Sequence, residues 1–184
     1  MLEGKNVNLR LMEKEDVDFI LECTNNLDFY GEYDPITQIS KTEMIKKLET
    51  QTPSTAETEK AVFIIEQKDK SKVGFARYSS SRFHGHAEIG YLVIPTERGK
   101  GYATEAAEII VDYLFLSKDI IRIEAGTNVK NKASQKVLEE AGFKKECIIR
   151  KSAFVRGAWA DSYLYSIIRE EWKRPKILTG KASD

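Results

Sequence analysis

The hydrophobic pattern of the chain predicts short strands alternating with amphipathic helices. Alternating or continuous apolar runs predict strands over residues 7–12, 61–66, 72–80, 88–94, 120–125, 144–152 and 161–168. Apolar residues at helical spacing predict helices over 14–25, 101–115 and 131–142, and the capping box Ser40-Lys-Thr-Glu43 predicts one over 40–50. Residues 26–39 and 51–60 are predicted to be loops, the second one polar and mobile. The predicted order of elements is βααβββαβαββ.

This order favours an α/β (α+β) protein with a mixed, mostly antiparallel twisted sheet and helices on both faces. The run 120–125 is rich in apolar residues, as is typical of a buried parallel strand, and a helix connects it to 88–94. No repeat or linker divides the chain. We therefore expect a single domain over 1–172, followed by a polar C-terminal tail, 173–184, that frays.

The junction between the strand 88–94 and the next helix has the features of a phosphate site. Pro95 ends the strand because it has no N–H for the sheet. The following loop contains two glycines, which let the backbone approach a ligand, and it leads into the positive end of a helix. A Walker A loop requires Ser or Thr after its lysine, where this chain has Gly101, and a dinucleotide fingerprint requires glycine at Thr104. A nucleotide phosphotransferase is therefore disfavoured.

Arg98-x-x-Gly101-x-Ala103 resembles the acetyl-coenzyme A signature of the GNAT N-acetyltransferases. With Glu-Ile-Gly-Tyr before it and Ala-Thr-Glu-Ala after it, the run looks like the RimJ/RimL-type branch, which acetylates protein N-termini and related amines. The resemblance covers nearly the whole chain and implies that the loop amides hold the coenzyme A pyrophosphate. The loop residues that it assigns to acetyl-CoA binding are Arg98, Gly99, Lys100, Gly101, Tyr102, Ala103 and Thr104.

Acetyl transfer also needs a fixed donor for the oxyanion, which a backbone N–H on a splayed strand supplies. We expect the strand to open at Val93 and Ile94, beside Pro95.

The departing thiolate benefits from a proton donor. Most GNAT proteins carry a tyrosine for this purpose seven residues beyond an asparagine, but Leu138 occupies that position here. The resemblance implies instead that Ser134 protonates or orients the thiol, while Asn128 and Asn131 contact the coenzyme. Plain helix capping by Asn131 and Ser134 is the alternative.

An attacking amine must first lose a proton. Glu88, where GNAT proteins often have a glutamate, is a candidate general base; a water molecule or a plain surface carboxylate is the alternative. The loop residues Glu32, Tyr33 and Asp34 would suit a cationic acceptor, which we expect to be a protein N-terminal amine or a small amine; an ordinary solvated loop is the alternative. The missing tyrosine keeps a second function open, a non-catalytic module that binds coenzyme A or another anion.

Composition narrows the class of partner. Lys plus Arg and Asp plus Glu are both 29, so nothing in the net charge points to nucleic acid or an anionic membrane. No signal-peptide core or membrane-length apolar run is present, so a cytoplasmic enzyme is expected, as a monomer or homodimer. Cys23 and Cys147 are expected to be buried or half-buried thiols, and His84 and His86 lack further metal ligands.

Overall fold

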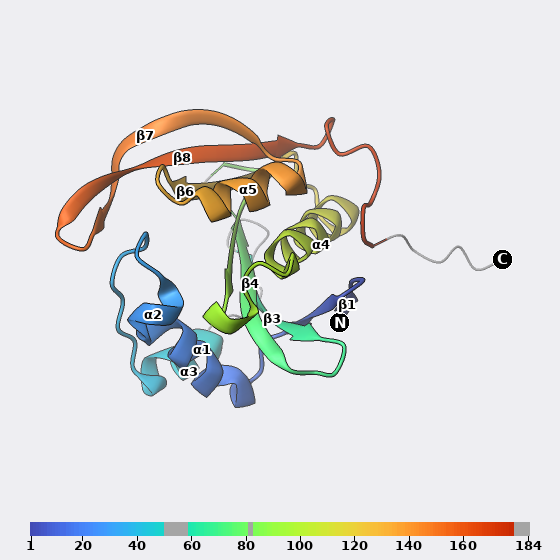
Figure 1. The fold of residues 1–184 in the computed structure, drawn as a ribbon. Coiled ribbons are helices and arrows are strands. Elements are labelled where there is room, and N and C mark those ends of the chain that lie inside the picture. Colours follow the sequence, from blue (N-terminus) through green and yellow to red (C-terminus); the bar gives the residue numbers. More distant parts are fainter. Residues whose placement is uncertain (50–58, 81–82, 179–184) are drawn as a thin grey trace.

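The computed structural model describes residues 1–49, 59–80 and 83–178. These residues form one eight-stranded sheet with helices on both faces (Figure 1). The strand order is β1-β2-β3-β4-β5-β6-β8-β7, and of the strand pairs described only β5–β6 is parallel. The predicted mixed, mostly antiparallel sheet is confirmed.

Most elements lie where the pattern placed them. The strands are β1 (Leu2–Glu3), β2 (Val7–Leu11), β3 (Lys60–Gln67), β4 (Lys72–Ser80), β5 (His86–Val93), β6 (Arg122–Asn128), β7 (Lys144–Val155) and β8 (Ala158–Ile168). The helices are α1 (Val17–Asn25), α2 (Leu27–Tyr30), α3 (Lys41–Glu49), α4 (Tyr102–Ser117) and α5 (Lys132–Ala141), with 3-10 turns at Lys14–Asp16 and Pro95–Glu97. None of the helices described is long and apolar enough to cross a membrane.

The structure differs from the predicted elements in three places. β1 and α2 were not predicted, because a two-residue strand and a four-residue helix are too short to show a period; Asn26 caps α2 by accepting a hydrogen bond from the Asp28 amide. The final hairpin is also longer than predicted, since β7 and β8 continue to the turn at Arg156-Gly157. Most of the predicted 51–60 loop lies outside the described residues.

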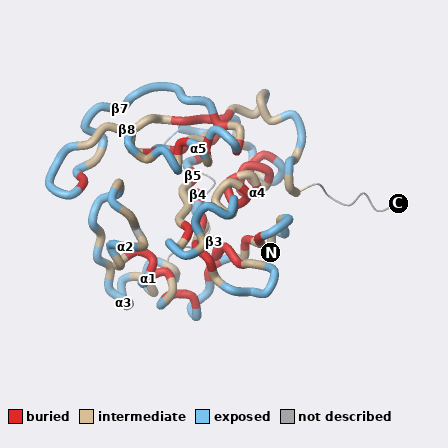
Figure 2. The backbone as a smooth tube through the Cα atoms, viewed as in Figure 1, coloured by how far each residue is buried: buried red, intermediate tan, exposed pale blue. Residues whose placement is uncertain are grey.

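The sheet is buried on both faces, as β3 shows. Its Phe63 and Ile65 belong to the large core beneath α4 and α5, whereas Ile64, between them, packs with α1 and α3. Figure 2 shows buried residues concentrated in the central strands and α4, while most of β7 is exposed. Cys23 is buried as predicted, but Cys147 is exposed because it lies on this outermost strand.

The expectation that the tail frays from residue 173 is wrong for its first part. Asp112, in the middle of α4, is 1% exposed and accepts a hydrogen bond from the indole of Trp172. The same carboxylate accepts from the backbone amides of Lys176, Ile177 and Leu178 at 2.7–3.0 Å to Oδ2. Residues up to 178 are therefore fixed to the domain.

Candidate active site

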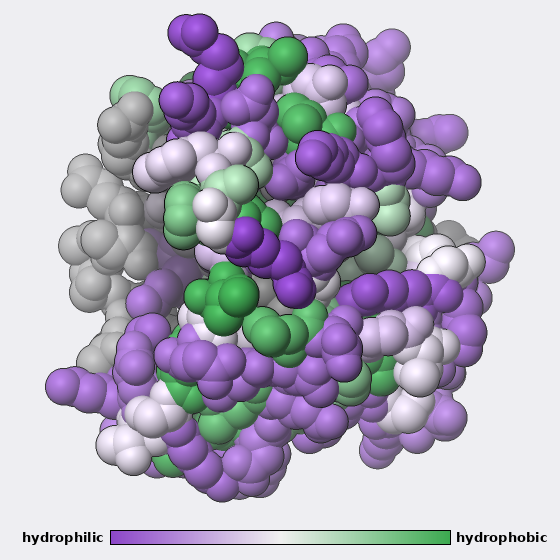
Figure 3. All heavy atoms as spheres, turned by 60° about the vertical axis from the view of Figure 1, so that its left-hand side comes forward, coloured by the Kyte–Doolittle hydropathy of each residue, from purple (hydrophilic) through white to green (hydrophobic). Residues whose placement is uncertain are grey.

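The site is built where two neighbouring strands separate. β5 and β6 pair only from His86 to Glu88 on β5, and from Ala125 onward β6 pairs with β8 alone. A cavity of about 1310 Å³ lies at this separation, with walls from both strands, α4, α5 and the α1–α3 side. Since a pocket for one small ligand has roughly 300–1,000 Å³, the space suits two reactants. The face shown in Figure 3 is mostly hydrophilic, with smaller hydrophobic groups near its middle.

The loop before α4 is open toward this cavity. Gly99 and Gly101 have φ of +77° and +83°, and a Cβ on either would have no atom within 4 Å. The first helical hydrogen bond runs from the Glu105 amide to the Gly101 oxygen, 3.0 Å. The amides from Gly101 to Thr104 therefore have no acceptor among the described residues, and they stand at the positive end of a 16-residue helix. These features fit the coenzyme A pyrophosphate.

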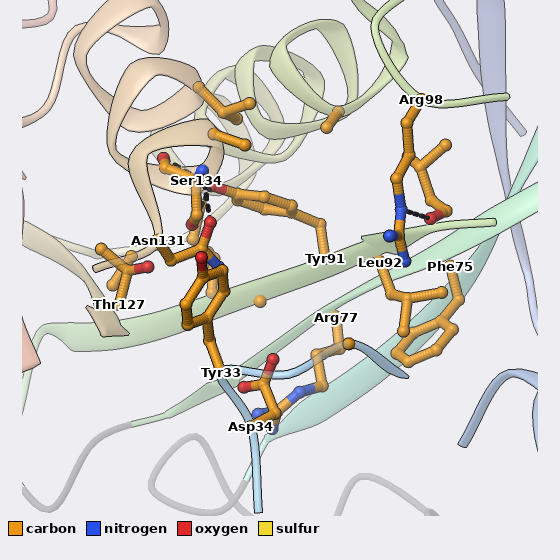
Figure 4. A pocket seen from close by; sticks show the side chains of 18 of the residues that line it. Tyr33, Asp34, Phe75, Arg77, Tyr91, Leu92, Arg98, Thr127, Asn131 and Ser134 are labelled. Atoms are coloured by element: carbon orange, nitrogen blue, oxygen red, sulfur yellow. Dashed lines mark hydrogen bonds between the residues drawn. The ribbon is translucent and has the colours of Figure 1, made fainter. Parts of the chain in front are cut away.

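The two basic side chains of the loop do not stand free at this position. The Lys100 ammonium pairs with Glu97 at 2.9 Å, and Lys100 is not among the residues that line the cavity, so a contact between its side chain and the coenzyme stays a prediction. Arg98 does line it, but its Nε donates to the Val93 oxygen at 3.0 Å and a terminal nitrogen donates to the Phe29 oxygen at 2.6 Å (Figure 4). Arg98 thus connects the end of β5 to α2.

Of the two residues predicted at the strand opening, only Val93 faces it. The Ile94 amide donates to the Val73 oxygen at 2.9 Å, so it is part of the sheet and is not available to a ligand. Successive amides of a strand point to opposite edges, which turns the Val93 amide toward the separated edge. Val93 lines the cavity and Ile94 is not among the lining residues, so of the two predicted positions the geometry favours Val93.

The start of α5 forms the next part of the wall. The Asn131 Oδ1 accepts from the Ser134 amide at 3.0 Å, and the Asn128 Oδ1 accepts from the Lys130 amide at 2.9 Å. Both asparagines therefore cap the backbone, and both line the cavity together with Ser134. Capping uses only the side-chain oxygen, so the amide nitrogen of Asn131 is left as a donor for a ligand.

Sequence reasoning missed Tyr91, which stands opposite Ser134. Its hydroxyl lies 3.1 Å from the Ser134 Oγ and 3.3 Å from the Ser134 carbonyl oxygen (Figure 4). Burial raises the pKa of Tyr91 to about 12, against the effect of the hydrogen bond with Ser134. The available signal was its position: Ile89 and Val93, two residues away on either side, face the core, and a tyrosine hydroxyl directed inward needs a partner.

The predicted acceptor residues Glu32, Tyr33 and Asp34 all line the opposite wall. A hydrogen bond with Glu32 raises the pKa of Tyr33. Asp34 is exposed at the surface, but desolvation at the cavity wall raises its pKa, and the charge of Arg77 opposes this shift. Figure 4 shows Arg77, which the sequence analysis did not single out, beside Asp34. This wall therefore carries both signs of charge.

Glu88 stands where the two strands part. It is exposed, lines the cavity and occupies the last paired position of β5, opposite Glu124. A carboxylate here can reach solvent and the cavity together, as proton removal from an entering amine requires.

A model of the "Acetyltransferase (GNAT) domain" matches residues 6–144. The chain belongs to the GNAT acetyltransferase family. It is 30% identical to probable N-acetyltransferase YjcK of Bacillus subtilis (strain 168), over 93% of this chain and 98% of YjcK. The predicted family and the predicted enzyme class, acetyl-CoA-dependent N-acetyltransferase, are confirmed.

Solved structures agree on the fold. The spermidine N-acetyltransferase of Vibrio cholerae, in complex with CoA and spermine, has a TM-score of 0.81 at 23% identity, over 92% of this GNAT chain and 99% of that one. The ribosomal-protein-S5-alanine acetyltransferase of Vibrio fischeri has a TM-score of 0.78 at 25% identity, over 94% and 98%. The second of these agrees with the RimJ/RimL-type resemblance of the motif.

Proposed function

We propose that this GNAT enzyme moves an acetyl group from acetyl-CoA to a primary amine by direct attack in a ternary complex. The acceptor is a protein N-terminal α-amine or a small polyamine-like amine. One observation carries the proposal: a single cavity joins the loop before α4, the hydroxyl of Ser134 and the carboxylates of the acceptor wall. Both reactants can thus meet without a covalent enzyme intermediate.

Each part of the donor wall has a role in this reaction. The amides from Gly101 to Thr104 bind the pyrophosphate, and the amide nitrogen of Asn131 bonds the pantetheine arm. The Val93 amide donates to the acetyl oxygen as negative charge develops on it. The Ser134 hydroxyl donates to the sulfur as the carbon–sulfur bond breaks.

The protons balance as follows. The acceptor arrives as an ammonium ion, and Glu88, directly or through water, removes one proton. The neutral nitrogen then attacks the acetyl carbon, a carbon–nitrogen bond forms and the carbon–sulfur bond breaks. The second proton leaves the nitrogen and ends on the coenzyme sulfur or in solvent. The products are the acetylated amine and free coenzyme A.

The charges of the acceptor wall favour an α-amine of a protein over a polyamine. A polyamine places several positive charges along its length, and Arg77 beside Asp34 would repel one of them. A peptide N-terminus carries one ammonium group next to a carbonyl oxygen, which suits a carboxylate and a guanidinium side by side. The names of the two solved relatives, one for spermidine and one for a ribosomal-protein alanine, cover both acceptor classes.

An amine panel tests the proposal, with release of the coenzyme A thiol as the readout. Peptides with a free α-amine, the same peptides with a blocked N-terminus, and polyamines should be compared at equal concentration. We expect release with free-amine acceptors, and we expect Ser134→Ala to lower kcat more than it raises the KM for acetyl-CoA. Coenzyme A binding without thiol release from any amine would instead identify a non-catalytic binding module.

A further inference from the structure

A tyrosine of the sheet, rather than of the helix, reaches the hydroxyl of Ser134. Leu138 stands at the helical position and is buried, so the helix supplies no phenol there. Tyr91 of β5 instead brings a hydroxyl to within 3.1 Å of the Ser134 Oγ, from the strand that borders the cavity. Figure 4 shows the two side chains directed at each other from β5 and α5.

We propose that Tyr91 is a positioning residue for Ser134: its hydroxyl donates to the Ser134 Oγ and so directs the serine's single proton at the coenzyme sulfur. This inference rests on the proposed function and adds the residue that orients its hydrogen-bond donor to the sulfur.

The Ser134 hydroxyl needs a hydrogen-bond donor beside it if its own proton is to face the sulfur. A serine and a tyrosine hydroxyl have one proton each. If Ser134 donated to Tyr91, no serine proton would be left for the sulfur. If Tyr91 donates to Ser134, the serine oxygen accepts and its own proton is free to face the cavity. A hydroxyl that accepts one hydrogen bond also becomes a stronger donor in the next.

Tyr91 does not itself supply the proton. Its pKa is raised to about 12 by burial, whereas a thiol has a pKa of about 8.5. Net transfer from this phenol to the thiolate would be unfavourable by more than about a thousandfold, and a serine hydroxyl is a weaker acid still. Both hydroxyls therefore act as hydrogen-bond donors, and the proton that ends on the sulfur comes from the amine. The same shift keeps Tyr91 protonated, and therefore a hydrogen-bond donor, throughout the neutral and mildly alkaline range.

The test compares Tyr91→Phe with a matched control, Tyr165→Phe. Tyr165 also reaches α5 from a strand, donating to Glu139 at 2.9 Å, but it does not line the cavity. Both changes remove one hydroxyl and keep the ring. Calorimetry should compare coenzyme A with desulfo-coenzyme A above pH 8.5, where the free thiol is largely ionised and accepts hydrogen bonds well.

We expect the wild type and Tyr165→Phe to bind coenzyme A several-fold more tightly than desulfo-coenzyme A. Tyr91→Phe and Ser134→Ala should both reduce this ratio toward one. In turnover, Tyr91→Phe should lower kcat roughly 5- to 10-fold, as for loss of one hydrogen bond, with little change in the KM for acetyl-CoA. Added to Ser134→Ala it should cause no further loss.

An unchanged affinity ratio in a folded Tyr91→Phe protein would overturn the inference, as would equal effects of Tyr91→Phe and Tyr165→Phe, which would reduce Tyr91 to a helix anchor. If no amine is acetylated by the wild type, the proposed function fails, while the affinity ratio still decides whether Tyr91 orients Ser134.

Discussion

Replacing Gly101 by alanine should separate two roles of this residue, one in backbone conformation and one in coenzyme binding. Gly101 has φ of +83°, where an L-residue with a Cβ costs about 1–2 kcal/mol. Its Cβ would meet no atom within 4 Å, so no clash adds to this cost in the free protein. The open space beside it is where the pyrophosphate is proposed to lie.

The chain offers a matched control in Gly157. It has φ of +84°, an equally open surrounding and a place in the β7–β8 turn, and it does not line the cavity. Gly157→Ala should therefore lose about the same 1–2 kcal/mol of stability. Only Gly101→Ala should lose affinity for the coenzyme. Loss of one hydrogen bond to a charged group, about 1.5–3 kcal/mol, would raise Kd roughly 10- to 150-fold.

The assay is calorimetric titration with coenzyme A, with thermal unfolding measured on the same samples. The expected result is a similar fall in Tm for both variants and a rise in Kd for Gly101→Ala alone. Should both variants bind coenzyme A within about twofold of the wild type, the pyrophosphate site lies elsewhere. Gly101→Val, with a β-branched side chain, would repeat the test with a larger obstruction.

Three further experiments, two substitutions and a pH–rate profile, test other parts of the molecule. Replacing Glu32 by Gln together with Asp34 by Asn should raise the acceptor KM. The increase should be larger at low salt than at high salt, because exposed charges are screened within roughly 10 Å. An acceptor KM that responds to neither the double substitution nor the ionic strength would exclude this wall from the acceptor site. Activity should rise with pH as the amine loses its proton, levelling near pH 8 for an α-amine but rising toward pH 10 for a lysine-type amine, and a pH–rate profile distinguishes them. Asp112→Asn should lower the free energy of unfolding by about 3 kcal/mol, because it weakens the contacts with the tail. Chemical denaturation measures this loss, and calorimetry should show an unchanged Kd for coenzyme A.

The loop before α4 could be predicted because its structure is determined locally. Pro95 ends a strand whatever surrounds it, and Gly99 and Gly101 permit positive φ without any distant contact. The helix then follows from its own apolar spacing. Such features depend only on neighbours in the sequence. The family prediction rested on them, and it was confirmed.

The contacts that complete the site could not be predicted in this way. Tyr91 and Ser134 are 43 residues apart, and Arg98 reaches Phe29 across 69 residues. A periodic pattern shows which face of an element is buried but not which residue of another element lies opposite. Asp112 is a similar case: a carboxylate within a helix gives no sign that a tail 60 residues later will bind it.

The alternation of β5 explains how one strand serves both reactants. Ile89, Tyr91 and Val93 face the core beneath α4 and α5, so the intervening positions face the acceptor side. One of these is Gly90, where a Cβ would lie 3.1 Å from the Arg77 Nε, so the absence of a side chain lets the guanidinium lie across the strand. Because β6 has separated from this strand, the edge between the two faces is open as well. The edge proposed to hold the thioester can therefore be reached from both faces, with Ser134 and Tyr91 on one side and the acceptor wall on the other.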